Sequence, residues 1–133
     1  ILNVMVNYNN AQYIRENIEN AQEQAKQKLS LLLDSMDYKM VTDIHHTDGI
    51  ETRIYQWTNN QNSHCIQLIW DGKEDWFDLG EFQCTDNLNY LNATQILLVP
   101  IRRGKLINRK NYVSKKVDLL IEALKKMNNH NTI

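Results

Sequence analysis

The apolar residues of this chain repeat with a helical period near both ends and with a strand-like pattern between them. Over residues 11–36 they step by three or four positions, with charged and amide side chains elsewhere. This spacing predicts one long amphipathic helix, because residues three or four apart share a helix face. Asn9 or Asn10 is the expected cap, since an Asn side chain accepts the free amide hydrogens of a first turn. The apolar positions are Ile14, Ile18, Ala21, Ala25, Leu29, Leu32, Leu33 and Met36.

Five short segments with strand composition follow that helix. They are rich in Ile, Val, Tyr, Trp and Thr, and turn residues separate them. Asp48-Gly49 and Asp71-Gly72 each favour a two-residue turn between paired strands, because Asp-Gly adopts positive φ readily. The last segment is almost continuously apolar, which predicts a central strand of the sheet. The predicted strands are 38–46, 50–58, 64–70, 75–83 and 95–101, and the first four form two hairpins, 38–58 and 64–83.

The carboxyl-terminal region predicts a second helix. Val113, Val117, Leu120, Leu124 and other apolar residues have helical spacing, and Asn111 is a plausible cap. Strands between two terminal helices indicate an α+β fold with a mostly antiparallel sheet of four or five strands. The helices are expected to share one face of the sheet and to leave the other face open. A chain of 133 residues is expected to form a single domain, 1–133.

Several classes of protein do not fit the composition. Hydrophobic runs are far shorter than the roughly 20 residues of a membrane helix, and no membrane partner is expected. Residues 1–6 lack the charged and long apolar regions of a signal peptide, which favours a cytoplasmic protein. Cys65 and Cys84 lack the spacing of a zinc or redox motif and are expected to be free thiols. No cofactor or metal is expected.

Charge is divided along the chain. Residues 1–86 carry 14 acidic and 6 basic residues, whereas residues 87–133 carry 2 acidic and 9 basic residues. Seven bases and no acid fall within 102–116, which creates a positive potential for an anionic partner. The candidate anion-binding residues are Arg102, Arg103, Lys105, Arg109, Lys110, Lys115 and Lys116.

The basic segment 102–116 has three possible partners. It can pair with the protein's own acidic hairpin at 71–81, or bind nucleic acid with Tyr112 stacking on a base, or bind an acidic protein.

Aromatic and acidic residues gather in the predicted hairpins. Trp76 and Phe77 are neighbours on one strand, so one of them is expected to face away from the helices. An exposed aromatic side chain ringed by acids has the composition of a binding hot spot for a basic partner. The candidate partner-binding residues are Trp57, Trp70, Asp75, Trp76, Asp78 and Glu81.

An enzymatic alternative begins from Asp71-Gly72-Lys73, which has the D-x-K form of a metal-dependent nuclease core. With Asp43 or Asp48 as a second ligand and a glutamate from the preceding helix, the order of elements resembles the PD-(D/E)xK nuclease superfamily. The resemblance implies Mg²⁺ held by the carboxylates and an attacking water steadied by Lys73. The sequence lacks the Pro-Asp pair of that family.

Histidine and cysteine residues suggest weaker sites. His45, His46, His64 and Cys65 could ligate a metal with a neighbouring aspartate, but adjacent residues of a strand point to opposite faces. The same geometry weakens a Cys-His nucleophile at His64-Cys65.

The sequence therefore favours a non-enzymatic module that binds a macromolecule, most simply another protein. Small inhibitor and immunity-type proteins have a similar architecture. A Mg²⁺-dependent nuclease and a nucleic-acid-binding protein are the alternatives.

Overall fold

The computed structural model describes residues 2–46, 52–84, 93–102 and 111–131. The elements run in the order α1 (Leu2–Ser35), β1 (Lys39–His46), β2 (Thr52–Asn59), β3 (His64–Asp71), β4 (Trp76–Gln83), β5 (Thr94–Pro100) and α3 (Tyr112–Asn131). The expected α+β class is confirmed, and each predicted strand lies within two residues of its observed bounds.

The long first helix extends further than the sequence predicts. It begins at Leu2 rather than near residue 11, so Asn9 and Asn10 lie inside the helix and do not cap it. No proline or glycine precedes residue 11, and asparagine lowers helix stability without stopping a helix.

The end of α1 is a Schellman motif. Asp37 has a φ of 67°, the Tyr38 amide donates to the Leu33 carbonyl (2.9 Å) and the Asp37 amide donates to the Asp34 carbonyl (3.1 Å). These bonds satisfy carbonyls that the helix leaves free. The motif turns the chain directly from α1 into β1.

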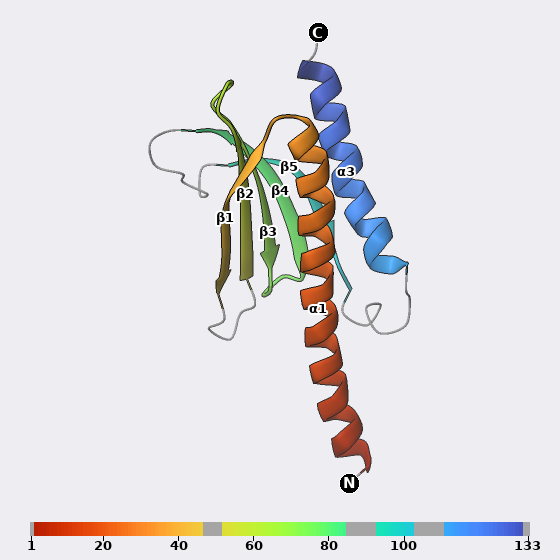
Figure 1. Ribbon diagram of the computed structural model, residues 1–133. Helices are drawn as coiled ribbons and strands as arrows, with labels where there is room; N and C mark the ends of the chain where they lie inside the picture. Colours follow the sequence, from red (N-terminus) through yellow and green to blue (C-terminus); the bar gives the residue numbers. More distant parts are fainter. Residues whose placement is uncertain (1, 47–51, 85–92, 103–110, 132–133) are drawn as a thin grey trace.

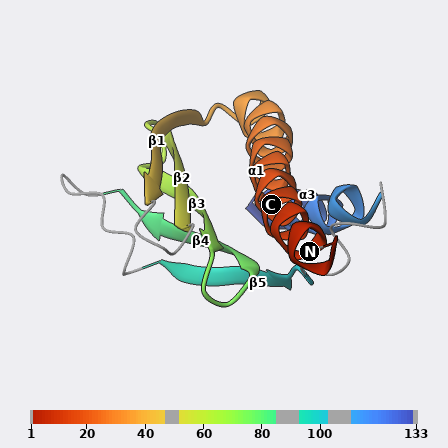
Figure 2. The same ribbon diagram turned by 90° about the horizontal axis from the view of Figure 1, so that it is seen from below.

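The five strands form one antiparallel sheet in the order β1-β2-β3-β4-β5. Both helices lie on the same side of this sheet, as Figures 1 and 2 show. The two hairpins and the shared side of the helices match the predictions. The prediction of a central last strand is wrong, because β5 is an edge strand. Its apolar run has a different cause: Val99 is buried in the core under the helices, and Leu98 faces the other side of the sheet.

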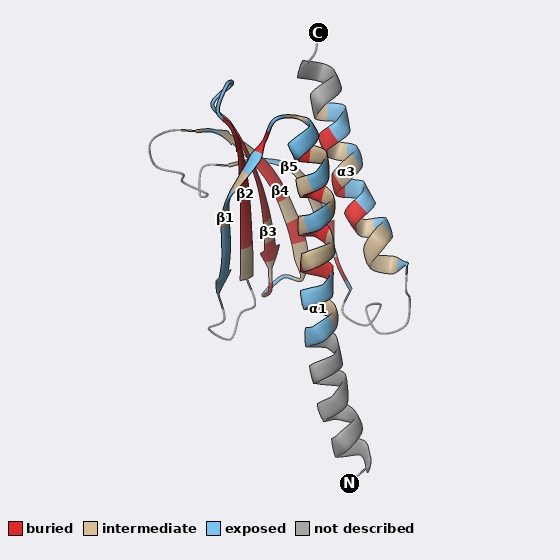
Figure 3. Cartoon of the chain, in the orientation of Figure 1, coloured by how far each residue is buried: buried red, intermediate tan, exposed pale blue. Residues whose placement is uncertain are grey.

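The core lies between the helices and the sheet (Figure 3). α1 supplies Ile18, Ala21, Ala25, Leu29 and Leu33, and α3 supplies Val117, Leu120 and Leu124. Alternate strand residues meet them, because the side-chain period of a strand is two. These residues are Tyr55, Trp57, Ile66, Leu68, Trp70, Phe77, Leu79 and Val99.

The turns between strands rely on side-chain capping. In the β2–β3 loop, the Asn59 side chain accepts the amide hydrogens of Gln61 and Asn62. The β3–β4 loop contains the four residues 72–75 rather than the expected two-residue turn, since Asp71 pairs with Trp76. Positive φ occurs at Asp75 (59°). The other predicted turn, Asp48-Gly49, lies outside the described residues.

The two cysteines form a disulfide, so the prediction of free thiols is wrong. Cys65 of β3 is bonded to Cys84, just beyond β4, with a Cα–Cα distance of 5.7 Å. Antiparallel pairing brings the start of β3 beside the end of β4.

Within the described residues, no helix is long and apolar enough to cross a membrane.

Candidate protein-binding face

The face of the sheet turned away from the helices carries an apolar row that crosses all five strands. Strand register joins Ile44 to Ile54, Ile54 to Ile69, Ile69 to Asp78, and Asp78 to Leu98. Four of these five residues are aliphatic and the fifth, on β4, is a carboxylate. In the adjacent row, Trp76 lies between Asp71 and Pro100. We call this set the uncovered face: Ile44, Ile54, Ile69, Asp71, Trp76, Asp78, Leu98 and Pro100.

This side of the sheet is accessible over only part of its length. Ile44 and Pro100 are exposed, Ile69, Asp71, Trp76, Asp78 and Leu98 are half-buried, and Ile54 is buried at 3% exposure. Further along the strands, Gln56 and Gln67 are only 3% and 2% exposed, and the Gln56 amide donates to Gln67 across 2.8 Å. Cys65 is also buried. The expectation of an entirely open face is therefore too broad, and the accessible part lies toward the β3–β4 loop.

Asp78 is the most unusual group on the uncovered face. Burial, followed by the negative charge of Asp71, raises the pKa of its carboxyl. Within the described part of the chain, Asp78 has no hydrogen bond donor and no ion-pair partner. A half-buried carboxylate in an aliphatic row lacks the partner that usually offsets the loss of hydration. A cationic group brought by another molecule would supply it.

The structure divides the predicted partner-binding residues into three groups. Trp57 and Trp70 are 1% and 0% exposed and pack under the helices, so their expected accessibility is wrong. Trp76 and Asp78 lie on the uncovered face, and Phe77 points into the core, as strand alternation predicts for this neighbouring pair. Asp75 lies in the β3–β4 loop, and Glu81 belongs to the helix-covered side.

Glu81 takes part in a hydrogen-bonded chain with two other side chains. His64 Nε2 lies 3.3 Å from Glu81 Oε2, and the Tyr38 hydroxyl lies 2.6 Å from His64 Nδ1. Burial, followed by the charge of Glu81, raises the pKa of Tyr38. A phenol with a raised pKa remains protonated and is a poor nucleophile. The chain of contacts therefore joins the end of α1 to β3 and β4.

Much of the basic segment lies outside the described residues, including Arg103, Lys105, Arg109 and Lys110. Arg102 and Lys115 are exposed, and Lys116 is half-buried with its ammonium 5.5 Å from the centre of the Tyr112 ring. The Tyr112 hydroxyl accepts the Arg102 amide hydrogen (2.9 Å). Tyr112 is thus engaged in contacts within the fold and is not a free stacking platform.

The acidic hairpin and the start of the basic segment are neighbours. The Asp75 carbonyl accepts the Ile101 amide hydrogen (2.8 Å), and Trp76 pairs with Pro100. The fold therefore brings the two oppositely charged parts of the chain together at one end of the sheet, as pairing between them would require.

The carboxylates of the nuclease hypothesis do not share a site. Asp71 Oδ1 accepts the amide hydrogens of Lys73 and Glu74 and so organises the hairpin loop. Asp43 pairs with Tyr55, whose side chain faces the helices, whereas Asp71 is on the uncovered face. A shared metal needs ligand atoms about 2 Å from the ion, which side chains on opposite sides of a sheet cannot provide. Asp48 lies outside the described residues.

Asp43 instead belongs to a network of ion pairs beside β1. Arg53 donates to both of its oxygens (3.0 and 3.2 Å), Lys26 lies 2.8 Å away, and Arg53 also pairs with Glu23 (3.4 Å). Burial favours a higher pKa for Asp43, but the bonds from Arg53 and Lys26 hold the pKa below its ordinary value. The network fastens α1 to β1 and β2.

The histidine and cysteine alternatives also separate in space. His45 and His46 pair with Arg53 and Thr52 and therefore project to opposite sides of the sheet. Among the described residues, no group of three or more His, Cys, Asp or Glu side chains could hold a metal ion. The disulfide removes Cys65 and Cys84 as nucleophiles.

Part of what sequence reasoning missed had a recognisable signal. Cys65 and Cys84 lie at facing ends of the predicted hairpin 64–83, and that symmetry could have suggested the disulfide. The Tyr38–His64–Glu81 contacts had no signal of this kind, because they depend on where α1 ends above the sheet.

Comparison with known proteins returns no match: no family model, no curated protein and no solved structure is similar to this chain. The described part of the chain defines the class, an α+β protein in which α1 and α3 lie on one side of a five-stranded antiparallel sheet.

Proposed function

We propose that this protein is a non-enzymatic binding module whose uncovered face recognises a basic protein segment. The observation that carries the proposal is the half-buried, unpartnered carboxylate of Asp78 in a row of aliphatic residues. Trp76, beside this row, is the kind of large, rigid side chain that dominates binding energies at protein interfaces.

Charge complementarity selects the partner. Asp71 is close enough to Asp78 for its negative charge to raise the pKa of the Asp78 carboxyl. A Lys or Arg side chain placed between them would gain two attractive interactions in a partly desolvated setting. The aliphatic row would cover the apolar stem of that same side chain. We therefore expect the partner to present a basic residue flanked by apolar ones.

The experiment is affinity capture from the native host with matched baits, followed by mass spectrometry and titration of the identified partner. Trp76→Ala and Asp78→Lys should each weaken binding by about tenfold or more. Leu119→Ala should bind normally, since Leu119 is an exposed hydrophobic residue on α3, on the other side of the sheet. Retention of the same partner by both uncovered-face variants would contradict the proposal.

The basic residues of 102–116 provide the alternative, a nucleic-acid-binding protein. The exposed positions of Arg102 and Lys115 near the start of α3 favour it. It predicts binding to single- or double-stranded nucleic acid that falls steeply with salt. Such binding, lost in a Lys115→Glu variant and kept in Asp78→Lys, would replace the protein partner proposed above.

The disulfide bears on where this module would act. Disulfides persist in oxidising compartments and are rare in the cytoplasm. The Cys65–Cys84 bond therefore favours an oxidising location over the cytoplasmic one expected from the sequence. Alkylation of the native protein before lysis, followed by mass spectrometry, distinguishes the two locations. Alkylated Cys65 and Cys84 would show free thiols and would support the cytoplasmic location instead.

A further inference from the structure

We propose a second binding site, formed by the outer edge of β1 and a groove between β1 and α1, that takes an extended, uncharged, apolar segment of another protein. This site goes beyond the proposed function, because it uses the sheet edge and the helix-covered side rather than the uncovered face.

The edge of β1 is a strand-pairing surface. β1 is the first strand of the sheet, and among the described strands it pairs with β2 alone. An edge strand presents a row of N–H and C=O groups to which an extended chain can bind. Register is regular over residues 42–46, and the irregularity between Met40 and Thr42 leaves Val41 as an extra residue. Figure 3 shows that β1 is exposed along most of its length, in contrast to β2 and β3.

Exposed apolar side chains distinguish this edge from a protected one. Val41, the extra residue at the irregularity, is 50% exposed. Edge strands usually avoid association through lysines, prolines or a covering helix. The opposite edge, β5, ends at Pro100 and contacts α3. β1 has one lysine, Lys39 at its first position, and that lysine is paired with Asp34.

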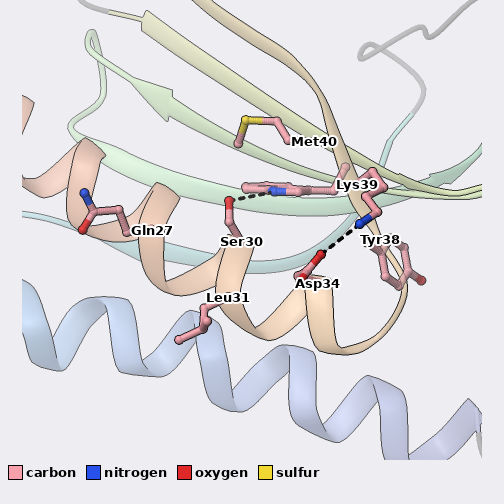
Figure 4. Close-up of a pocket in the computed structure, with 8 residues that line it drawn as sticks. Gln27, Ser30, Leu31, Asp34, Tyr38, Lys39 and Met40 are labelled. Atoms are coloured by element: carbon pink, nitrogen blue, oxygen red, sulfur yellow. Dashed lines mark hydrogen bonds and ion pairs between the residues drawn. The ribbon is translucent and has the colours of Figure 1, made fainter.

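A groove of about 400 Å³ opens beside the first residues of β1. Figure 4 shows Met40 on the strand side of this groove and Ser30 pointing toward it from α1, whereas Leu31, which also borders the groove, points toward α3. The Trp57 indole, which donates to Ser30 Oγ across 3.0 Å, also lines it. Leu31 is 78% exposed, the highest value among the large hydrophobic residues described. Met40 and Trp57 suit the apolar side chains that an added strand would direct toward the helices, since alternate residues of a strand share a side.

The charges around the groove neutralise one another, which selects an uncharged segment. Asp34 and Lys39 form an ion pair at one end (3.3 Å). Further along β1, Asp43 is matched by Lys26 and Arg53. A charged side chain entering the groove would lose hydration without gaining an unpaired opposite charge. An extended segment with apolar residues at alternate positions is the occupant that both the edge and the groove accept.

The test uses a synthetic, end-capped peptide of alternating Val and Thr residues, with a second peptide that carries a central proline as its control. Isotope-labelled protein is titrated with each peptide and followed by NMR. We expect the first peptide to shift the backbone amides of 39–46 and the Trp57 indole. The proline peptide should bind at least about tenfold more weakly, because proline removes a donor needed for strand pairing.

Two variants and a matched control complete the test. Val41→Lys and Leu31→Lys should each weaken peptide binding by about tenfold or more, while Leu119→Lys on α3 should leave it unchanged. Circular dichroism checks folding, and Leu31→Lys alone decides the outcome if Val41→Lys does not fold. No binding by the alternating peptide, or binding that the edge variants do not affect, would overturn the proposal. If the protein forms dimers as its concentration rises and Val41→Lys abolishes them, the edge of β1 binds a second copy of this chain rather than another protein.

Discussion

Gln22 is a polar residue in an apolar environment. It is fully buried on α1 among Ala21, Ala25 and the strands, and neither side-chain atom has a hydrogen-bond partner in the described part of the chain. Its backbone carbonyl accepts the Tyr55 hydroxyl hydrogen at 3.3 Å. An unsatisfied buried amide costs about 1–3 kcal/mol.

We therefore expect Gln22→Leu to raise the free energy of unfolding by about 1–2 kcal/mol, measured by urea denaturation. Gln27→Leu is the matched control, since Gln27 is exposed on the same helix and its change should stay within about 0.5 kcal/mol. Destabilisation by Gln22→Leu would show that the amide has a bound partner, such as an internal water.

The ionised carboxylate of Asp78 is expected to lower the stability of the fold and to strengthen binding of a basic partner. Because its folded pKa is raised above the ordinary value of 3.8, ionised Asp78 opposes folding at neutral pH. This destabilisation of the folded state is fully present at pH values above the raised pKa, and it disappears as the pH falls below 3.8. We expect Asp78→Asn to raise the urea midpoint at pH 7 and to lose this advantage in acid.

The same Asp78→Asn variant should bind the basic partner more weakly, so stability and binding should change in opposite directions. Glu74→Gln, which removes an exposed charge from the same hairpin, isolates the effect of burial at Asp78. A pH-independent difference between the two variants would contradict this account of Asp78.

At the scale of elements, the Cys65–Cys84 disulfide closes the hairpin of β3 and β4. The bridged residues are 19 positions apart, and a loop of that size gives a stabilisation of about 3 kcal/mol in the chain-entropy model. The Cys84 amide also donates to the Ser63 carbonyl (2.7 Å), which extends the pairing beyond the strands.

We expect a Cys65→Ala, Cys84→Ala double variant to lose about 2–4 kcal/mol of unfolding free energy, measured by denaturation without reductant. A reducing agent should lower the stability of the natural protein toward that of the variant and leave the variant unchanged. Equal stability of the natural protein with and without reductant would show that the bridge contributes little.

At the scale of the whole molecule, the fold brings the acidic and basic parts of the chain into contact at two places. Lys28, in the acidic part of the sequence, lies 3.6 Å from Asp118 in the basic part and joins α1 to α3. The β3–β4 loop meets the end of β5 through Asp75 and Ile101. The surfaces that we propose for partners are two small regions: Asp78 with Asp71 on the uncovered face, and the electrically neutral groove beside β1.

The candidate site could be predicted from the sequence only in part. Strand alternation correctly separated Trp76 from Phe77, because successive strand residues always point to opposite sides. It could not say which side the helices cover, so Trp57 and Trp70 were placed on a binding surface although they form the core. It also could not place β5 at an edge, since an apolar strand is consistent with either position.

The sequence by itself determined the α+β class and the elements seen in the described part of the chain, which are α1, α3 and the five strands. Those features depend on residues a few positions apart, which the period of apolar side chains records directly. Only the tertiary structure decided the Cys65–Cys84 bond, the Tyr38–His64 contact and the isolation of Asp78. Each depends on residues that are distant along the chain and meet because the helices pack on one side of the sheet.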